Sequence, residues 1–267
     1  MTEKLSNTLP EMLAKSTALD TGAAIIYNGK TLSYRELEAH SKRAAAGLAA
    51  NGIGIGDRVA FWLPNTPAYL VLYFACARLG AITVAVNTRF RASEVEDVLG
   101  RTGAKALVMW PGFRGIDFVG ILEEVDKAAL SMLETAILYS ESGEFAGPLP
   151  CATKIVSYSE LLDAGNQELD AAVANLGCNM FTTSGTTKAP KFVLHSHASM
   201  AVHAAEVAMD FGYADPATVV HQDMPLCGVF GITGVLATIA AARPLILTSS
   251  FDAERTAALM GKYKVTH

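Results

Sequence analysis

The chain has 267 residues, of which 51% are hydrophobic and 18% are charged. This balance allows a large buried core in one or two domains and favours a soluble metabolic protein. The net charge of −5 at pH 7, with no cluster of Lys and Arg residues, argues against a nucleic-acid partner.

The cysteines and the N-terminal residues indicate a reducing, cytoplasmic location. The stretch Met1–Pro10 is polar and has no apolar core, so we expect no signal peptide. The four cysteines are far apart and lack C-x-x-C or metal-ligand spacing, which favours reduced thiols over disulfides or zinc. They are Cys76, Cys151, Cys178 and Cys227.

The first predicted elements form a hairpin. Ala23–Tyr27 and Lys30–Leu32 are short strand-like runs that flank Asn28-Gly29, a favoured two-residue turn. We therefore expect these two runs to pair as antiparallel strands at the start of the fold.

Helices and strands alternate along the rest of the chain. Two capping boxes, Ser33 with Glu36 and Ser93 with Glu96, predict helix starts. Apolar periodicity predicts further helices at Thr66–Leu79, His197–Phe211, Gly228–Ala241 and Asp252–Lys262. Short apolar runs predict further strands at Arg58–Trp62, Ile82–Val86, Ala106–Trp110, Cys178–Phe181, Phe192–His195, Thr218–Gln222 and Pro244–Thr248.

Repeated strand–helix–strand units predict an α/β fold with parallel-rich sheets flanked by helices. The stretch Tyr139–Pro150 is rich in Gly, Ser and Pro and therefore predicts a connection between two subdomains. We expect a helical lead-in over residues 1–22, a first α/β subdomain over 23–140 and a second over 151–267.

The segment Met224–Ala242 carries no charged residue and is near the length that crosses a bilayer. It contains Pro225 and several glycines, however, and a strand pattern follows it. We therefore expect a buried helix that is entered through a loop, and no transmembrane segment.

The stretch from Thr182 to Lys191 joins two predicted strands and carries five hydroxyl side chains around Gly185. Glycine lets the backbone approach a ligand, hydroxyl and N–H groups donate to phosphate oxygens, and lysine adds positive charge. The stretch is not a Walker loop, which needs Gly directly before its Lys and Ser or Thr directly after. Composition alone is equally consistent with a polar hairpin turn and with phosphate binding.

The order of these residues is more specific than their composition. It resembles the phosphate-loop signature T-S-G-T-T-G-x-P-K-G-V of the adenylate-forming superfamily, the AMP-dependent synthetases and ligases. The matching positions are Thr183, Ser184, Gly185, Thr186, Thr187, Pro190, Lys191 and Val193, with Ser196 and His197 closing the motif. Lys188 and Phe192 stand where the family most often has glycine.

The resemblance extends from about Ala23 to the last residue and is weakest between Pro111 and Asn175. The sequence around Asn87 is more similar to that of acyl-CoA synthetases than to that of peptide-synthetase adenylation domains. Further matching segments are Thr31–Leu37, Gly56–Ala60, Leu63–Asn65, Val86–Phe90, Pro225-Leu226 and Val229–Gly231.

The resemblance implies a two-step reaction on ATP. A carboxylate, such as a fatty acid, attacks the α-phosphate to give an acyl-adenylate and pyrophosphate, and coenzyme A then takes the acyl group. ATP, Mg²⁺ and CoA are thus the implied cofactors, with Mg²⁺ bound through ATP and no separate protein metal site. The implied phosphate-binding residues are Thr183, Ser184, Gly185, Thr186, Thr187, Lys188 and Lys191.

The resemblance also implies where the small-molecule carboxylate binds. Many relatives carry an aromatic residue or His at the position of Gly228, so the shape of their pocket does not carry over. No histidine lies beside Cys227, which argues against a cysteine nucleophile. The implied pocket residues are His221, Cys227, Gly228, Val229, Phe230 and Gly231.

Two histidines flank the end of the loop motif. His197 matches the motif histidine and is expected to orient the loop and the following helix. His195 and His197 have a spacing that could hold a metal, but no nearby carboxylate or cysteine completes such a site. We therefore expect no metal site there.

Complete members of the superfamily are about twice as long as this chain, and the segment with their catalytic lysine has no counterpart here. We therefore expect an N-terminal half that is inactive alone and that associates, as a homodimer or through the surface left by the missing half. Two alternatives are open: a stand-alone half-domain acting as a nucleotide-binding, regulatory or interaction module, and an unrelated α/β protein that hydrolyses nucleotide phosphates.

Overall fold

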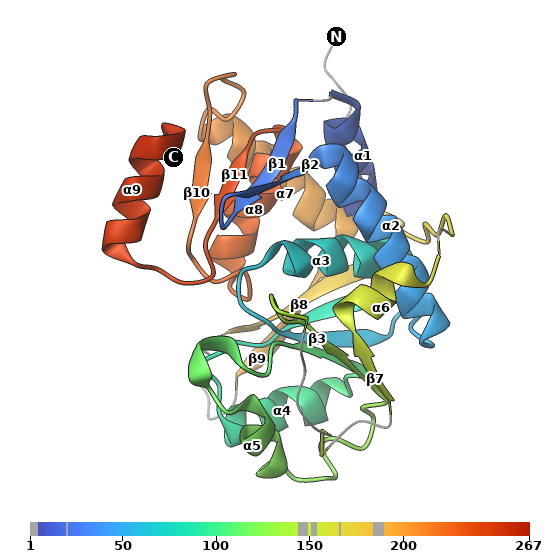
Figure 1. Ribbon diagram of the computed structural model, residues 1–267. Helices are drawn as coiled ribbons and strands as arrows, with labels where there is room; N and C mark the ends of the chain where they lie inside the picture. Colours follow the sequence, from blue (N-terminus) through green and yellow to red (C-terminus); the bar gives the residue numbers. More distant parts are fainter. Residues whose placement is uncertain (1–4, 20, 144–148, 151–153, 166, 184–189) are drawn as a thin grey trace.

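The structure is a computed structural model that describes residues 5–19, 21–143, 149–150, 154–165, 167–183 and 190–267. The described strands form two sheets flanked by helices, which confirms the predicted α/β architecture (Figure 1). One sheet has the strand order β7-β6-β5-β3-β4-β8-β9, and the other has the order β10-β11-β1-β2.

The larger sheet is parallel from β7 to β8, while β9 pairs with β8 in antiparallel fashion. All four side chains of its interior strand β5 are buried, as expected for a parallel strand covered on both faces. The strands of this sheet are β3 (Arg58–Trp62), β4 (Ile82–Ala85), β5 (Ala106–Met109), β6 (Thr135–Leu138), β7 (Lys154–Ser157), β8 (Gly177–Thr183) and β9 (Lys191–Ser196).

Helices cover both faces of the larger sheet, with α3 on one face and α4 and α5 on the other (Figure 1). Because successive side chains of a strand point to opposite faces, β3 contributes Val59 and Phe61 to the first core and Ala60 and Trp62 to the second. The helices are α1 (Leu9–Leu19), α2 (Tyr34–Ala50), α3 (Pro67–Leu79), α4 (Ala92–Thr102), α5 (Phe118–Glu123), α6 (Tyr158–Asp163), α7 (His197–Asp210), α8 (Val229–Ala240) and α9 (Ala253–Tyr263), with a 3-10 helix at Phe113–Gly115.

The smaller sheet contains the predicted hairpin, whose turn residues Asn28 and Gly29 have φ angles of 49° and 76°. Its first strand pairs in parallel with β11, and Ile25 lies opposite Leu245. The strands of this sheet are β1 (Ala23–Tyr27), β2 (Lys30–Ser33), β10 (Val220–Gln222) and β11 (Leu245–Leu247). Each sheet therefore draws strands from both sides of residues 139–150, and the predicted division into subdomains stays a prediction.

One of the two predicted capping boxes is confirmed and the other is wrong. The Ser33 side chain accepts from the Glu36 N–H, and the Glu36 carboxylate accepts from the Ser33 N–H at 2.7 Å. The helix predicted from Ser93 and Glu96 is α4, which begins earlier than predicted, at Ala92. Its cap uses Glu94, whose carboxylate accepts from the Arg91 N–H at 3.0 Å.

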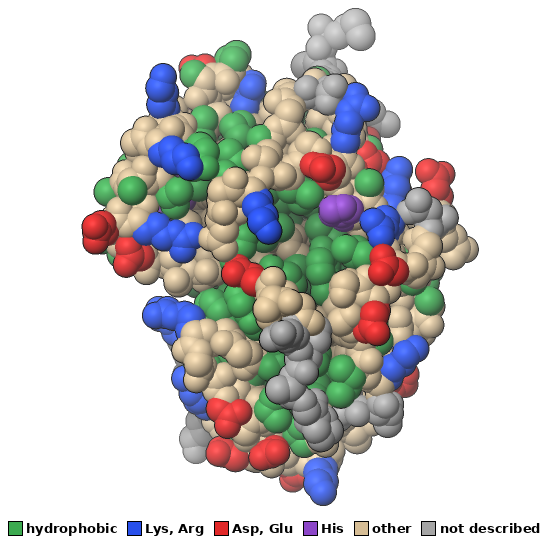
Figure 2. All heavy atoms as spheres, in the orientation of Figure 1, with side chains coloured by type: hydrophobic (Ala, Val, Ile, Leu, Met, Phe, Trp, Pro, Cys, Tyr) green, Lys and Arg blue, Asp and Glu red, His purple; other side chains and the backbone are tan. Residues whose placement is uncertain are grey.

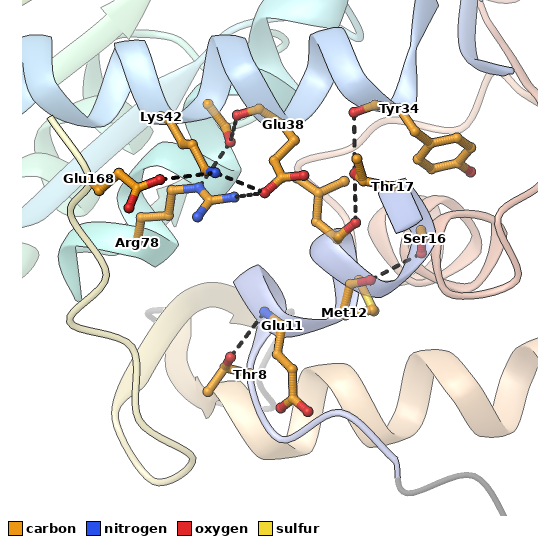
Figure 3. Close-up of polar contacts among 12 residues, drawn as sticks. Thr8, Glu11, Met12, Ser16, Thr17, Tyr34, Glu38, Lys42, Arg78 and Glu168 are labelled. Carbon is orange, nitrogen blue, oxygen red and sulfur yellow. Dashed lines mark hydrogen bonds and ion pairs between the residues drawn. The ribbon is translucent and has the colours of Figure 1, made fainter. Parts of the chain in front are cut away.

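A buried ion pair ties α2 to α3. Arg78 of α3 lies 3.6 Å from Glu38 of α2 and donates through Nε to the Ser41 hydroxyl at 3.0 Å. Figure 3 shows Arg78 and Lys42 pointing toward the same Glu38 carboxylate, and Lys42 is 3.2 Å from it. A buried charge is costly unless it is paired, so these contacts hold α3 in place against α2.

The uncharged segment at 224–242 forms α8, which packs against α7 and the first core. In the part of the chain that the structure describes, no helix is long and apolar enough to cross a membrane. Basic and acidic side chains are interspersed on the face shown in Figure 2.

Candidate functional site

An open pocket of about 220 Å³ lies between the larger sheet and the segment that leads into α8. Ala85 at the end of β4 and Thr182 near the end of β8 both border it, and these two strands run parallel. Ligands of α/β sheets bind beyond the carboxyl ends of strands, and this pocket lies at such an edge. Its full lining is Ala85, Asn87, Phe90, Thr182, Met224, Pro225, Cys227, Gly228, Phe230 and Gly231.

The buried side chain of Asn65 holds one wall of the pocket. Its Nδ2 donates to the Met224 carbonyl oxygen at 3.0 Å, and its Oδ1 accepts from the Leu226 N–H at 2.9 Å. Tyr69 of α3 also donates from its hydroxyl to the Leu226 carbonyl at 3.3 Å. An amide side chain offers a donor and an acceptor together, so a single residue fixes both peptides of this segment.

Two glycines, Gly228 and Gly231, lie at the entry into α8, and only the second must lack a side chain. The Gly228 N–H donates to the Pro225 carbonyl at 3.0 Å, which closes a tight turn before the helix. A Cβ added at Gly231 would overlap the same Pro225 carbonyl oxygen and come within 2.9 Å of the Met224 oxygen. A Cβ at Gly228 would meet Pro225 only at an ordinary 3.4 Å. The turn and the helix can therefore approach this closely only without a side chain at Gly231.

The two strands beside the predicted phosphate loop, β8 and β9, pair with each other. In this antiparallel pair Thr183 lies opposite Lys191, and the Thr183 hydroxyl donates to the Lys191 carbonyl at 3.5 Å. Lys191 is exposed. The predicted site residues Ser184, Gly185, Thr186, Thr187 and Lys188 lie outside the described residues.

The structure thus brings together four of the predicted pocket residues, Cys227, Gly228, Phe230 and Gly231, and sets them beside the strand that enters the loop. Val229 and His221 do not line this pocket. The Nε2 atom of the His221 ring lies 3.4 Å from the hydroxyl of Thr248, the residue that follows strand β11. The assignment of these two residues to the substrate site stays a prediction.

Cys227 borders the pocket as a thiol. Burial raises the pKa of Cys227 to about 11, so the thiol stays protonated at neutral pH. Because the thiolate is the reactive form, this environment does not activate a nucleophile. Among the residues that the structure describes, no three His, Cys, Asp or Glu side chains form a group that could hold a metal ion.

Other residues of the pocket wall are absent from the sequence-based site assignment: Ala85, Asn87, Phe90, Thr182, Met224 and Pro225. Asn87 and Phe90 belong to a segment that matches the superfamily, and the match alone could have suggested them. The Asn87 carbonyl accepts from Trp62 Nε1 at 3.1 Å, which holds this segment against the end of β3.

His197 lies at the junction of β9 and α7 and is fully buried. Its Nδ1 accepts from the Leu9 N–H at 3.5 Å, which joins α1 to the start of α7. Burial lowers the pKa of His197 from 6.5 to about 4, although Asp170 acts in the opposite direction. The side chain is therefore neutral at physiological pH and serves as a contact between helices.

This depressed pKa predicts a pH-dependent stability. A histidine whose pKa is lower in the folded state stabilises the fold fully above pH 6.5, and that contribution is lost as the pH falls toward 4. We expect the free energy of unfolding to fall by about 2 kcal/mol between pH 7 and pH 5 because of this residue. Urea unfolding at a series of pH values measures it.

The matched variant is His197→Asn, whose side-chain oxygen can replace Nδ1 as an acceptor and does not titrate in this range. It should be less stable than the parent at pH 7 and should lose less stability than the parent on acidification. An equal loss in both proteins would assign the pH dependence to other groups.

The chain is similar to CoA ligases that act on different carboxylates. It is 28% identical over 246 residues to a feruloyl-CoA synthase from an Amycolatopsis species, a match that covers 91% of this chain and 44% of that protein. The fold matches a long-chain-fatty-acid-CoA ligase from Archaeoglobus fulgidus with a TM-score of 0.83, at 22% identity over 99% of this chain and 52% of that one.

A second solved structure is o-succinylbenzoate coenzyme A synthetase from Bacillus subtilis in complex with ATP and magnesium ion. It matches with a TM-score of 0.74 at 21% identity, over 99% of this chain and 63% of that chain. The chain thus spans about half the length of proteins that share its fold.

The family model described as "AMP-binding enzyme" matches residues 14–267, which is almost the whole chain. The match includes the strands beside the phosphate-loop motif and every residue that lines the pocket. The chain therefore belongs to the AMP-binding enzyme family.

Proposed function

We propose that the whole protein to which this chain belongs is an AMP-forming carboxylate–CoA ligase. In the first step a carboxylate oxygen attacks the α-phosphorus of ATP, and pyrophosphate leaves to give an acyl-adenylate. In the second step the thiol of coenzyme A attacks the acyl carbon, and AMP leaves. The proposal rests on membership of the AMP-binding family together with the arrangement of the pocket.

One observation carries the proposal furthest. Thr182 lines the same pocket as Cys227, Gly228 and Gly231, and it directly precedes the phosphate-loop motif. A carboxylate in this pocket would therefore lie beside nucleotide phosphates bound by the motif. Adenylation requires this proximity, because positioning the two reactants supplies much of the rate acceleration in phosphoryl-type transfers.

We assign phosphate binding to the motif, including its exposed lysine, Lys191. Hydroxyl and backbone N–H groups would donate to the β- and γ-phosphate oxygens, and the lysine cations would neutralise charge as pyrophosphate forms. Mg²⁺ would enter bound to ATP. The residues are Thr183, Ser184, Gly185, Thr186, Thr187, Lys188 and Lys191.

The acyl substrate is assigned only as a small carboxylate. The pocket wall is formed mainly by apolar side chains and backbone, and the related proteins act on feruloyl, fatty-acyl and o-succinylbenzoyl groups according to their names. A fatty acid and an aromatic acid both fit this chemistry. Because the chain spans about half of its relatives, we expect it to be inactive alone, and self-association stays a prediction.

Carboxylate-dependent exchange of labelled pyrophosphate into ATP tests the proposal on the whole protein. We expect exchange with at least one member of a panel of aliphatic and aromatic carboxylates, and none without a carboxylate. Binding of ATP without exchange for any carboxylate would instead favour a nucleotide-binding module.

A further inference from the structure

Arg101 of α4 contacts the end of the phosphate-loop motif at two points. Its Nη1 donates to the Pro190 carbonyl oxygen at 2.8 Å. The centre of its guanidinium group lies 4.5 Å from the centroid of the Phe192 ring, within the range of a cation–π contact. The Asp97 carboxylate, one helical turn earlier, accepts from the same Nη1 at 2.9 Å and orients the side chain.

These contacts bracket one residue. Pro190 and Phe192 are the neighbours of Lys191, so Arg101 restrains the peptide before this lysine and the side chain after it. Across the strand pair, Thr183 hydrogen-bonds to the Lys191 carbonyl. Successive side chains of a strand point to opposite faces, so the Lys191 side chain lies on the face opposite to that of Phe192. The backbone of Lys191 is thus held from two sides, while the residue is exposed to solvent.

The aromatic ring is essential to this arrangement. A planar guanidinium group can stack on a ring while its N–H groups donate elsewhere, which an ammonium group cannot do. Phe192 stands where a glycine is most common in similar sequences, and a glycine would give Arg101 nothing to stack on. The pair Arg101 and Phe192 therefore forms a unit with the Pro190 carbonyl.

We propose that Arg101 is a positioning residue that fixes Lys191 for contact with nucleotide phosphates. This inference rests on the proposed function, because it takes Lys191 as a phosphate ligand. Arg101 itself touches the protein, and its effect on the nucleotide is transmitted through the Pro190–Phe192 backbone. Disordering that backbone lowers the fraction of molecules in which Lys191 is ready to bind, which weakens ATP binding without changing the carboxylate pocket.

The test compares Arg101→Met, which keeps the apolar stem but removes the charge and the donors, with the parent protein. We expect the Kd for MgATP, measured by equilibrium dialysis, to rise about three- to tenfold. The KM for ATP in pyrophosphate exchange should rise in parallel, while the KM for the carboxylate and the melting temperature stay within error. Arg114→Met, at an exposed arginine on the 3-10 helix, serves as the matched control and should change none of these values.

Two further variants separate positioning from a general charge effect. Arg101→Lys should recover only part of the ATP affinity, because it restores charge without the planar stacking group. In a Phe192→Gly background, Arg101→Met should weaken ATP binding by a smaller factor than in the parent, since the two side chains act together. Full recovery with Lys, or equal factors in both backgrounds, would overturn the positioning role.

The outcomes also separate this inference from the function on which it rests. The inference alone is wrong if the parent binds MgATP and Lys191→Ala weakens that binding but Arg101→Met does not. If the parent binds no MgATP, the proposed function and the inference fall together.

Discussion

Replacing Lys191 by alanine is expected to slow adenylation by about ten- to a hundredfold and to leave thioester formation nearly unchanged. The substitution removes a charge-assisted contact to phosphate, typically about 1.5–3 kcal/mol, and 1.4 kcal/mol corresponds to a factor of ten in rate. The contact strengthens as charge moves onto the leaving pyrophosphate, so it acts on the transition state. In the second step pyrophosphate has already left.

Two single-turnover measurements on the whole protein separate the steps: adenylate formation from ATP, and thioester formation from a preformed acyl-adenylate. Lys188→Gly is the matched control, because it removes a neighbouring cation and installs the residue most common in similar sequences. It should cost far less than Lys191→Ala. Equal slowing of both steps by Lys191→Ala would show that this lysine supports structure and does not bind phosphate.

Gly231→Ala should damage both the fold and the substrate pocket. Alanine is the better helix former by about 1 kcal/mol, so helix propensity alone predicts a gain in stability. The new Cβ would overlap the Pro225 carbonyl oxygen, however, and backbone cannot rotate away as a side chain can. We expect a net loss of about 2–3 kcal/mol in the free energy of unfolding, because overpacking of this kind exceeds the propensity gain.

The same displacement should raise the KM for the carboxylate at least about tenfold, since Pro225 and Met224 form the pocket wall that must move. Gly228→Ala is the matched control in the same segment: its Cβ would meet Pro225 at an ordinary contact distance. Chemical unfolding and carboxylate titrations measure both effects. A Gly231→Ala protein as stable and as active as Gly228→Ala would contradict the packing described here.

Sequence patterns predicted a turn and a helix start whose contacts lie within a few residues of one another. The Asn28-Gly29 turn was predictable because both residues take positive φ readily, and Ser33 with Glu36 satisfies its own helix start. The second cap shows the limit of such rules. Glu96 fits the capping pattern with Ser93, but its carboxylate instead accepts from the Asp126 N–H at 2.9 Å, a residue thirty positions away. Glu94 then caps the helix, two residues earlier than predicted.

Assembly of the sheets depends on contacts that no local pattern contains. The pairing of β1 with β11 joins residues more than two hundred positions apart. Strand β6 and the edge strand β7 lie in the region where the chain least resembles the superfamily. In the candidate site, too, some residues were predictable from the sequence and others depend on contacts between distant segments. The residues near Gly228 were predictable from the motif, while the role of Asn65 in holding Met224 and Leu226 required the folded arrangement.

The most direct test of the proposed function follows a labelled oxygen through the reaction. The whole protein is incubated with ATP, CoA and a carboxylate that carries ¹⁸O in both oxygens and supports pyrophosphate exchange. If the carboxylate attacks the α-phosphorus, one ¹⁸O atom must appear in the phosphate of AMP, with pyrophosphate and acyl-CoA as the other products. Unlabelled AMP, or ADP with inorganic phosphate as the nucleotide products, would contradict it.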